Sequence, residues 1–253
     1  MAAWHPARNG SVVLLTLTLP PINALDREAL EELAVIIENV ESDTETRALI
    51  ITGGVEGIFC TGGDLKYWRN IDDANAVSGA GRKVLEHLQA LKVPTVAAIN
   101  GRVIGDGLAL ALACDLRVAA DCATFRLPEI AYGFIPGWGT IGWLVDAVGR
   151  ACAADVLLTG KPISGPRAQQ IGLVHYAVAS EDLMRHALKL GAELATGSRD
   201  AIAAAKCALR GGDEGACFAR VWGGADRREG MDALIAKRKP VFEQGGSQHD
   251  LAR

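Results

Sequence analysis

Two stretches of the sequence decide the fold: residues 48–66, ALIITGGVEGIFCTGGDLK, and residues 95–114, TVAAINGRVIGDGLALALAC. Each begins with a short apolar run, which is typical of a strand buried on both faces. Each then enters a glycine-rich turn. Such turns at the carboxyl ends of strands let backbone N–H groups point into a crevice, where a ligand can approach without a Cβ in the way.

The flanking sequence extends this pattern. Residues 11–19 (SVVLLTLTL) predict a strand, and Asp26 is the expected N-cap of the helix that follows. Helical spacing recurs near residues 79–91 and 108–114, and residues 116–119 and 123–127 are strand-like. We therefore expect an α/β core in residues 1–195, with right-handed crossovers, and an all-helical region in residues 196–253.

Composition narrows the class of protein. A net charge of −4 argues against a nucleic-acid partner, because phosphate contacts need a concentrated basic face. We find no apolar run of membrane-spanning length and no leader-like segment in MAAWHPARNG, so we expect a cytoplasmic protein. The cysteines lack metal-site spacing, which predicts reduced thiols and no metal centre; they are Cys60, Cys114, Cys122, Cys152, Cys207 and Cys217.

The glycine turns do not match nucleotide-binding motifs. The run Gly105-Asp106-Gly107 is followed by Leu-Ala-Leu and lacks the third glycine of a dinucleotide fingerprint, and no P-loop or G-x-S-x-G sequence occurs. Two interpretations remain. The turns serve packing alone, or their N–H groups converge on one substrate oxygen as an oxyanion hole.

The order of several segments resembles the enoyl-CoA hydratase/isomerase (crotonase) family. Residues 48–66 look like its first oxyanion segment and residues 95–114 like its second; residues 20–30, 125–137 and 228–242 also match. The resemblance implies a spiral core of repeated ββα units, with C-terminal helices that build a trimer or a hexamer. It assigns the oxyanion N–H groups to Gly63 and Asp106.

The resemblance also implies which carboxylate acts. Family hydratases carry two glutamates around a water; this chain keeps one as Glu129 and has Ala109 in place of the other. A methyl group cannot activate water, so a single carboxylate favours proton shuttling, as in the family's double-bond isomerases. Hydration, decarboxylation and C–C cleavage stay open, as does a non-catalytic acyl-CoA-binding homologue. An RNA-binding role lacks a lysine-rich helix to support it.

Two features of this site are expectations that the structure has to test. Ile130, Tyr132 and Phe134 follow Glu129 and are expected to give it an apolar setting that raises its pKa. Asp106 has two interpretations: an N-cap of the next helix, or a second titratable group at the thioester.

The remaining assignments concern the substrate. By resemblance, coenzyme A enters as part of the substrate, with no separate cofactor, and is held by Asp64, Leu65, Lys66 and Lys237. Ala109 is assigned to the acyl pocket, and Trp138, which follows Pro136-Gly137, either shapes that pocket or simply fills the core. His87 is a further pocket candidate, although an ordinary helix histidine fits the same pattern.

Overall fold

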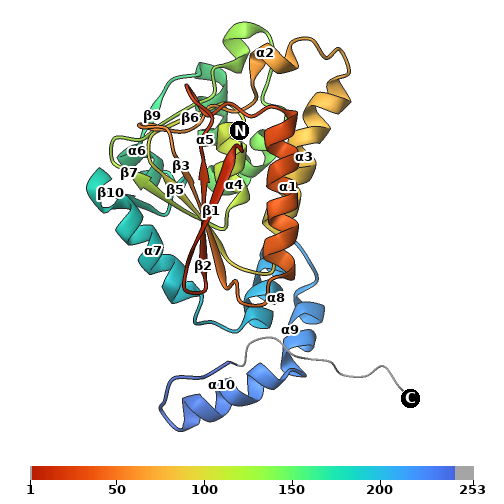
Figure 1. Ribbon diagram of the computed structural model, residues 1–253, viewed down its shortest axis with the longest axis vertical. Helices are drawn as coiled ribbons and strands as arrows, with labels where there is room; N and C mark the ends of the chain where they lie inside the picture. The colour runs from red at the N-terminus through yellow and green to blue at the C-terminus, as the bar shows by residue number, and fades with distance from the viewer. Residues whose placement is uncertain (1, 243–253) are drawn as a thin grey trace.

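Two β-sheets organise the chain in the computed structural model, which describes residues 2–242 (Figure 1). The larger sheet has the strand order β1-β2-β3-β5-β7-β10, and every neighbouring pair is parallel except β1 and β2. Its strands are β1 (Trp4–Asn9), β2 (Val12–Leu17), β3 (Ala48–Gly53), β5 (Thr95–Ile99), β7 (Leu116–Ala120) and β10 (Tyr176–Val178).

The smaller sheet is made by the continuations of the central strands. Its order is β4-β6-β8-β9, and β4, β6 and β8 follow β3, β5 and β7 directly along the chain. A helical segment follows each such pair, so the expected ββα repeat is present. The strands are β4 (Ile58–Cys60), β6 (Arg102–Ile104), β8 (Thr124–Arg126) and β9 (Ile163–Ser164).

Helices cover both faces of the larger sheet, which explains its apolar central strands. Helix α7 (Leu183–Leu194) contacts β3, β5 and β7, while α1 (Arg27–Ser42) and α3 (Ala74–Ala90) pack together on the other side (Figure 1). Every residue of β5 is buried, as expected of a strand covered on two faces. The Asp26 carboxylate accepts a 2.8 Å hydrogen bond from the Ala29 N–H, which confirms the predicted N-cap.

The helices between the sheets hold the glycine turns in place. Helix α4 (Gly107–Ala113) is buried along its whole length, and α5 (Thr140–Thr159) packs against it. Along the chain, the short helix α2 (Leu65–Trp68) follows β4, and the short helix α6 (Gly165–Gln170) follows β9. No helix in residues 2–242 is long and apolar enough to cross a membrane.

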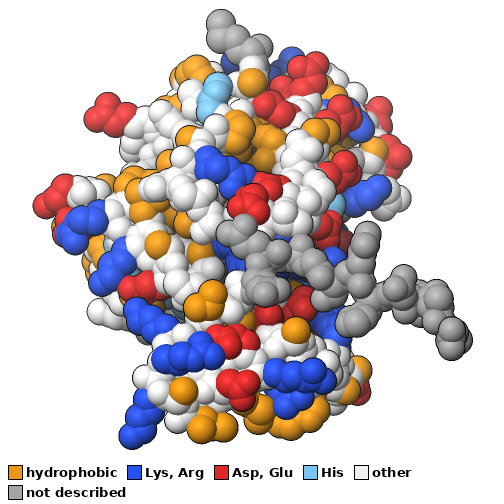
Figure 2. All heavy atoms as spheres, turned by 60° about the horizontal axis from the view of Figure 1, so that its bottom comes forward, with side chains coloured by type: hydrophobic (Ala, Val, Ile, Leu, Met, Phe, Trp, Pro, Cys, Tyr) orange, Lys and Arg blue, Asp and Glu red, His pale blue; other side chains and the backbone are white. Residues whose placement is uncertain are grey.

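The C-terminal part is helical, as predicted, and extends away from the sheets. It comprises α8 (Arg199–Leu209), α9 (Glu214–Trp222) and α10 (Ala225–Ile235). Figure 2, which looks toward this end, shows charged side chains of both signs with apolar ones among them. Leu209, Leu234 and Ile235 are among the large apolar side chains left exposed. The division at residues 195 and 196 stays a prediction, and residues 243–253 lie outside the described part.

Two strands depart from the sequence expectations. Strand β1 contains Pro6 and was not predicted; it is an edge strand, where a missing N–H breaks no central ladder. The apolar run that begins at Ala48 was expected to lead straight into a glycine-rich turn, yet β4 lies within that segment. Its three residues are all buried and pair with β6, so pairing rather than length defines this strand.

Candidate active site

The two glycine turns lie against each other at the ends of β4 and β6. Gly62 has φ +82° and Gly105 has φ +56°, backbone conformations that side chains rarely adopt. A Cβ on Gly62 would stand 2.9 Å from the Asp106 nitrogen, closer than such contacts allow. The sequence therefore needs glycine at residue 62 to bring the first turn against the second.

Each turn leaves one N–H group available. Within residues 2–242, neither the Gly63 nor the Asp106 N–H donates a hydrogen bond to the protein, whereas the neighbouring Asp64 and Gly105 N–H groups do. Unpaired donors on adjacent turns are what an oxyanion hole requires, because the protein supplies them ready-oriented to the developing charge.

Glu129 lies beside this pair of turns. It opens the short 3₁₀ helix η1 (Glu129–Tyr132), and its side chain is only 5% exposed. A Cβ on Gly105 would overlap the Glu129 Oε1 atom, so the carboxylate lies directly over the second turn. Its Oε2 atom is buried and has no partner among the described residues. A buried carboxylate oxygen without a partner is costly for stability and is a common feature of reactive groups.

The surroundings of Glu129 favour its protonated form. Burial, with a smaller contribution from the nearby charge of Asp106, raises the pKa of Glu129 to about 7. The expected rise in the pKa of Glu129 is present, although Ile130, Tyr132 and Phe134, the apolar residues expected to supply it, are all exposed. Within the short 3₁₀ helix η1, Glu129 is the buried residue.

The Asp106 side chain has a role that neither sequence interpretation described. It makes no cap bond to α4. Its carboxylate instead accepts hydrogen bonds from the backbone N–H groups of Gly137 and Trp138, both at 3.1 Å, and from the Thr140 hydroxyl at 2.7 Å. Burial raises the pKa of Asp106, while these three hydrogen bonds oppose that rise. Asp106 therefore ties the second turn to the start of α5.

Trp138 is brought to the same place. Its ring is 2% exposed, and its Cζ2 atom would stand 3.3 Å from a Cβ on Gly63. Its indole Nε1 donates a 3.1 Å hydrogen bond to the Val77 carbonyl on α3, and its ring meets the Trp68 ring edge-on at 6.3 Å. The structure thus groups Gly63, Asp106, Glu129 and Trp138.

Of the other predicted site residues, four lie near the glycine turns in the chain and two lie elsewhere. Ala109 is fully buried on α4, three residues beyond Asp106. Asp64 accepts a hydrogen bond from the Lys66 N–H and so caps α2, while Leu65 and Lys66 are exposed immediately after Gly63. The start of α2 is therefore exposed to solvent beside the first glycine turn.

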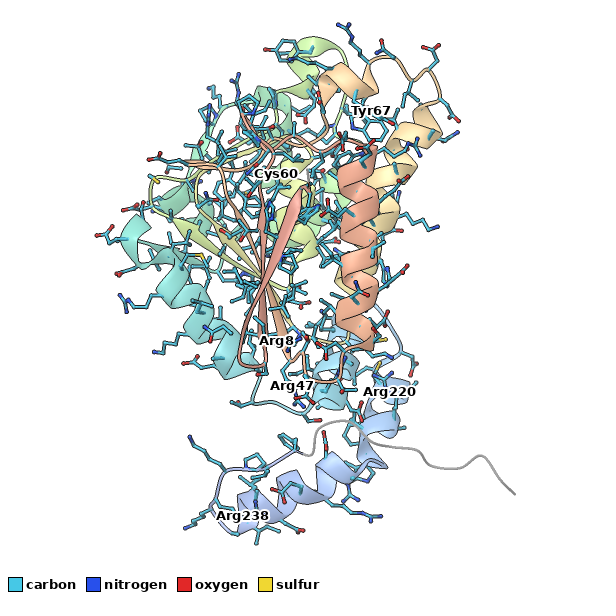
Figure 3. The ribbon with its side chains drawn as sticks, viewed as in Figure 1. Arg8, Arg47, Cys60, Tyr67, Arg220 and Arg238 are labelled. Carbon is cyan, nitrogen blue, oxygen red and sulfur yellow. The ribbon has the colours of Figure 1, made fainter. Side chains whose placement is uncertain are left out.

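Two predicted residues lie elsewhere. The His87 Nε2 atom is 3.2 Å from the Glu41 carboxylate on α1, so the ring faces the α1–α3 contact and not Glu129. Of the two interpretations of His87, the structure fits the ordinary helix histidine. Lys237 is exposed after α10, next to Arg238, which Figure 3 shows at the opposite end of the chain from Cys60 and Tyr67. Within one chain, Lys237 therefore does not reach the turns.

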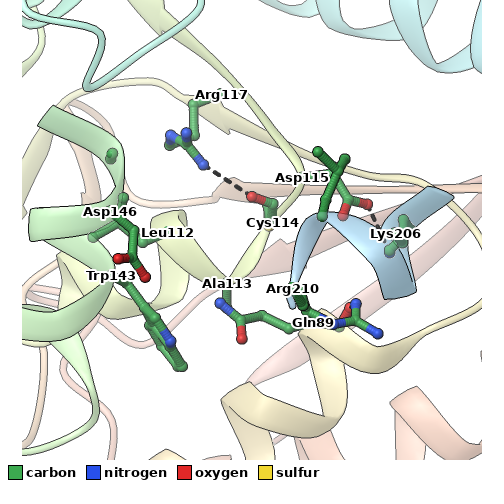
Figure 4. A pocket seen from close by; sticks show the side chains of 12 residues that line it. Gln89, Leu112, Ala113, Cys114, Asp115, Arg117, Trp143, Asp146, Lys206 and Arg210 are labelled. Carbon is green, nitrogen blue, oxygen red and sulfur yellow. Dashed lines mark hydrogen bonds and ion pairs between the residues drawn. The ribbon is translucent and has the colours of Figure 1, made fainter. Parts of the chain in front are cut away.

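A separate cavity of about 270 Å³ contains none of these residues. It lies between the ends of α3 and α4 and the helices α5 and α8, with Cys114, Arg117, Trp143 and Lys206 in its wall (Figure 4). The groups that sequence reasoning missed are Thr140, Val77 and Gly81, since no motif marks them. In residues 2–242 no cluster of three His, Cys, Asp or Glu side chains is placed to hold a metal ion.

Comparison with known proteins agrees with the fold. The enoyl-CoA hydratase/isomerase family matches residues 7–245. The chain is 36% identical to the 2,3-dehydroadipyl-CoA hydratase of Escherichia coli K12, over 94% of this chain and 97% of that protein. It is 35% identical to the putative enoyl-CoA hydratase/isomerase YngF of Bacillus subtilis strain 168, over 93% and 96% respectively.

Solved structures give the same answer. An enoyl-CoA hydratase from Bacillus anthracis superposes with a TM-score of 0.89 at 30% identity, covering 96% of this chain and all of that one. The fold and the paired turns define a crotonase-fold enzyme that acts on acyl-CoA thioesters. The chain belongs to the enoyl-CoA hydratase/isomerase family.

Proposed function

We propose that this enzyme stabilises the enolate of an acyl-CoA thioester and moves a proton with Glu129 alone, as a double-bond isomerase does. The observation that carries the proposal is the Glu129 carboxylate, buried over the Gly105 turn with an unpartnered oxygen, beside two N–H groups free to bind an oxyanion. The proposed roles of Gly63, Asp106 and Glu129 rest on this arrangement.

The chemistry follows from these groups. The Gly63 and Asp106 N–H groups bind the thioester oxygen, which acidifies the α-carbon because the negative charge of the enolate collects on that oxygen. Glu129 removes the α-proton of a 3-enoyl thioester, holds it, and returns it to the γ-carbon, so the double bond moves into conjugation. A group whose pKa is about 7 is suited to both halves of this transfer near neutral pH.

Ala109 supports isomerisation over hydration. It follows Asp106 by about one helical turn, and its methyl group can neither hold nor activate water. Hydration is the second candidate, because relatives such as the Escherichia coli protein carry the name hydratase. Decarboxylation and C–C cleavage pass through the same enolate and remain alternatives within the proposal.

The binding of coenzyme A is proposed from position. Asp64, Leu65 and Lys66 adjoin Gly63 at the exposed start of α2 and are proposed to hold the CoA moiety. If Lys237 contributes as well, it has to come from another copy of the chain, because its own α10 is distant from the turns. The exposed apolar residues of α8 and α10 support assembly into a trimer or hexamer. Location in the cytoplasm stays a prediction.

The experiment is incubation with 2-enoyl-, 3-enoyl-, malonyl-type and saturated CoA thioesters in D₂O, followed by mass analysis of the products. Deuterium at the α- or γ-carbon and a shifted double bond are expected. Glu129→Gln should lower that turnover by about 10²- to 10⁴-fold while CoA affinity changes little. Net addition of water would move the assignment to hydratase. Binding without any exchange would leave a non-catalytic acyl-CoA-binding protein.

A further inference from the structure

Trp138 is fixed against both halves of the oxyanion site. Its backbone N–H donates to the Asp106 carboxylate at 3.1 Å, and its ring edge stands next to Gly63. The indole is therefore within a side chain's length of the place where a thioester carbonyl would bind. The ring therefore occupies space beside the proposed position of that carbonyl.

The ring has no freedom to move aside. Its Nε1 donates to the Val77 carbonyl at 3.1 Å, and it is packed edge-on against Trp68, whose own Nε1 donates to the Leu25 carbonyl at 2.9 Å. Moving the indole would break this hydrogen bond and leave the N–H of a buried side chain without an acceptor, which is costly.

Helix α3 is shaped to receive the indole. Gly81 is buried on α3, and a Cβ built on it would overlap three atoms of the Trp138 ring. Any other residue at 81 would displace the ring. Glycine in the middle of a helix costs stability, so its presence at this contact is explained by the space that the indole occupies.

We infer that Trp138, with its backbone held by Asp106 and its ring seated on Gly81, ends the acyl pocket and restricts the enzyme to thioesters with a short acyl chain. This specificity role rests on the proposed function, because it assumes that the thioester carbonyl binds at Gly63 and Asp106. A longer chain needs the space that the indole fills, whereas a crotonyl-sized group does not.

The test compares chain lengths in the wild type and in Trp138→Leu, which removes the indole and keeps an apolar side chain. Affinities for butyryl-CoA and decanoyl-CoA are measured by calorimetry, and kcat/KM is measured for crotonyl-, hexenoyl- and decenoyl-CoA. The wild type should favour the short member of each series. Trp138→Leu should improve binding of decanoyl-CoA by about 10-fold or more and change that of butyryl-CoA by less than about 3-fold.

Two further variants make the result decisive. Trp143→Leu, a tryptophan on α5 that lines the separate cavity, should leave the chain-length profile unchanged. Trp138→Phe is the milder replacement if Trp138→Leu does not fold, and it should shift the profile in the same direction by a smaller factor. A wild type that binds decanoyl-CoA more tightly than butyryl-CoA would overturn the inference. So would a folded Trp138 variant with an unchanged profile.

The two proposals fail in different ways. If no thioester is turned over but short acyl-CoA binds in preference to long, the enolate chemistry is wrong and the role of Trp138 stands. If isomerisation occurs with equal efficiency for every chain length, the proposed function stands and the role of Trp138 is wrong.

Discussion

Thr140 donates a 2.7 Å hydrogen bond from its hydroxyl to the Asp106 carboxylate and so joins the second glycine turn to the first turn of α5. Thr140 is fully buried and Asp106 is half-buried. The same carboxylate accepts two backbone N–H groups, so one side chain satisfies three donors. The geometry of the oxyanion turn therefore depends on a contact some thirty residues further along the chain.

Removing this carboxylate should destabilise the fold. Asp106→Ala leaves the Thr140 hydroxyl and the N–H groups of Gly137 and Trp138 without an acceptor, and we expect the free energy of unfolding to fall by about 2–4 kcal/mol. Thr140→Val removes one donor together with its need for a partner and should cost about 1 kcal/mol. Urea denaturation measures both. Equal losses for the two variants would contradict the prediction.

The pH dependence of turnover should report Glu129. The carboxylate has to be ionised to accept the substrate proton, so kcat/KM should rise with pH through about 7, the raised pKa of Glu129. Asp106→Asn removes a negative charge that raises this pKa, while the Asp106 backbone N–H is retained. The rise should then move to lower pH.

The control is Asp213→Asn, at an exposed cap of α9, which should leave the pH profile in place. A profile that is unchanged in Asp106→Asn would mean that the charge of Asp106 does not reach Glu129. Complete loss of activity in a folded Asp106→Asn protein would instead assign the carboxylate a direct part in the reaction.

The elements that the sequence predicted are those set by local pattern. The run ALIIT and the Asp26 cap specify a buried strand and a helix start through neighbouring residues alone, and both are present. Strand β4 has three residues and exists because it pairs with β6, which no local pattern contains. Short elements of this kind need the tertiary structure.

Prediction of the candidate site from the sequence is limited in the same way. Gly63 and Glu129 could be assigned to the candidate site because they lie in segments whose order resembles that of the family. The partners of Asp106 were missed, since Gly137, Trp138 and Thr140 lie about thirty residues away and nothing in the sequence joins them to the turn. The assignment of His87 to the pocket came from helix position, which says nothing of the face that meets Glu41.

Glu129 should also weaken the fold at neutral pH. Its folded pKa of about 7 lies above the ordinary value of 4.5, so the native state holds the proton more tightly than the unfolded state. The stability from this group is fully present below about pH 4.5 and is lost as the pH rises through about 7. Glu129→Gln removes that loss and should stabilise the protein by about 1–3 kcal/mol at pH values above the folded pKa.

Urea midpoints at acidic and mildly alkaline pH measure this effect. Glu181→Gln, an exposed residue in the 3₁₀ helix η2 (Ser180–Asp182), is the matched control and should change neither midpoint. We expect Glu129→Gln to be the more stable protein and to have a much lower turnover. A Glu129→Gln protein that is equally destabilised at both pH values would show that the carboxylate is a structural group.

Lys206 should anchor α8 to the core. Its Nζ atom is 2.7 Å from the Asp115 carboxylate and donates a 2.8 Å hydrogen bond to the Val93 carbonyl (Figure 4 shows the ion pair), and its side chain is 7% exposed. Lys206→Met removes the buried cation from this pair, while Asp115 is half-buried and keeps its hydrogen bonds from Thr95, so the free energy of unfolding should fall by about 1–3 kcal/mol. Lys189 on α7 forms an exposed pair with Glu193 at 3.9 Å, and Lys189→Met should cost less than about 0.5 kcal/mol.

Urea denaturation compares the stability of the two lysine variants, and limited proteolysis reports whether α8 to α10 are released first in Lys206→Met. If both lysine variants lose the same small amount, α8 is held by its apolar contacts and the ion pair is incidental to its docking.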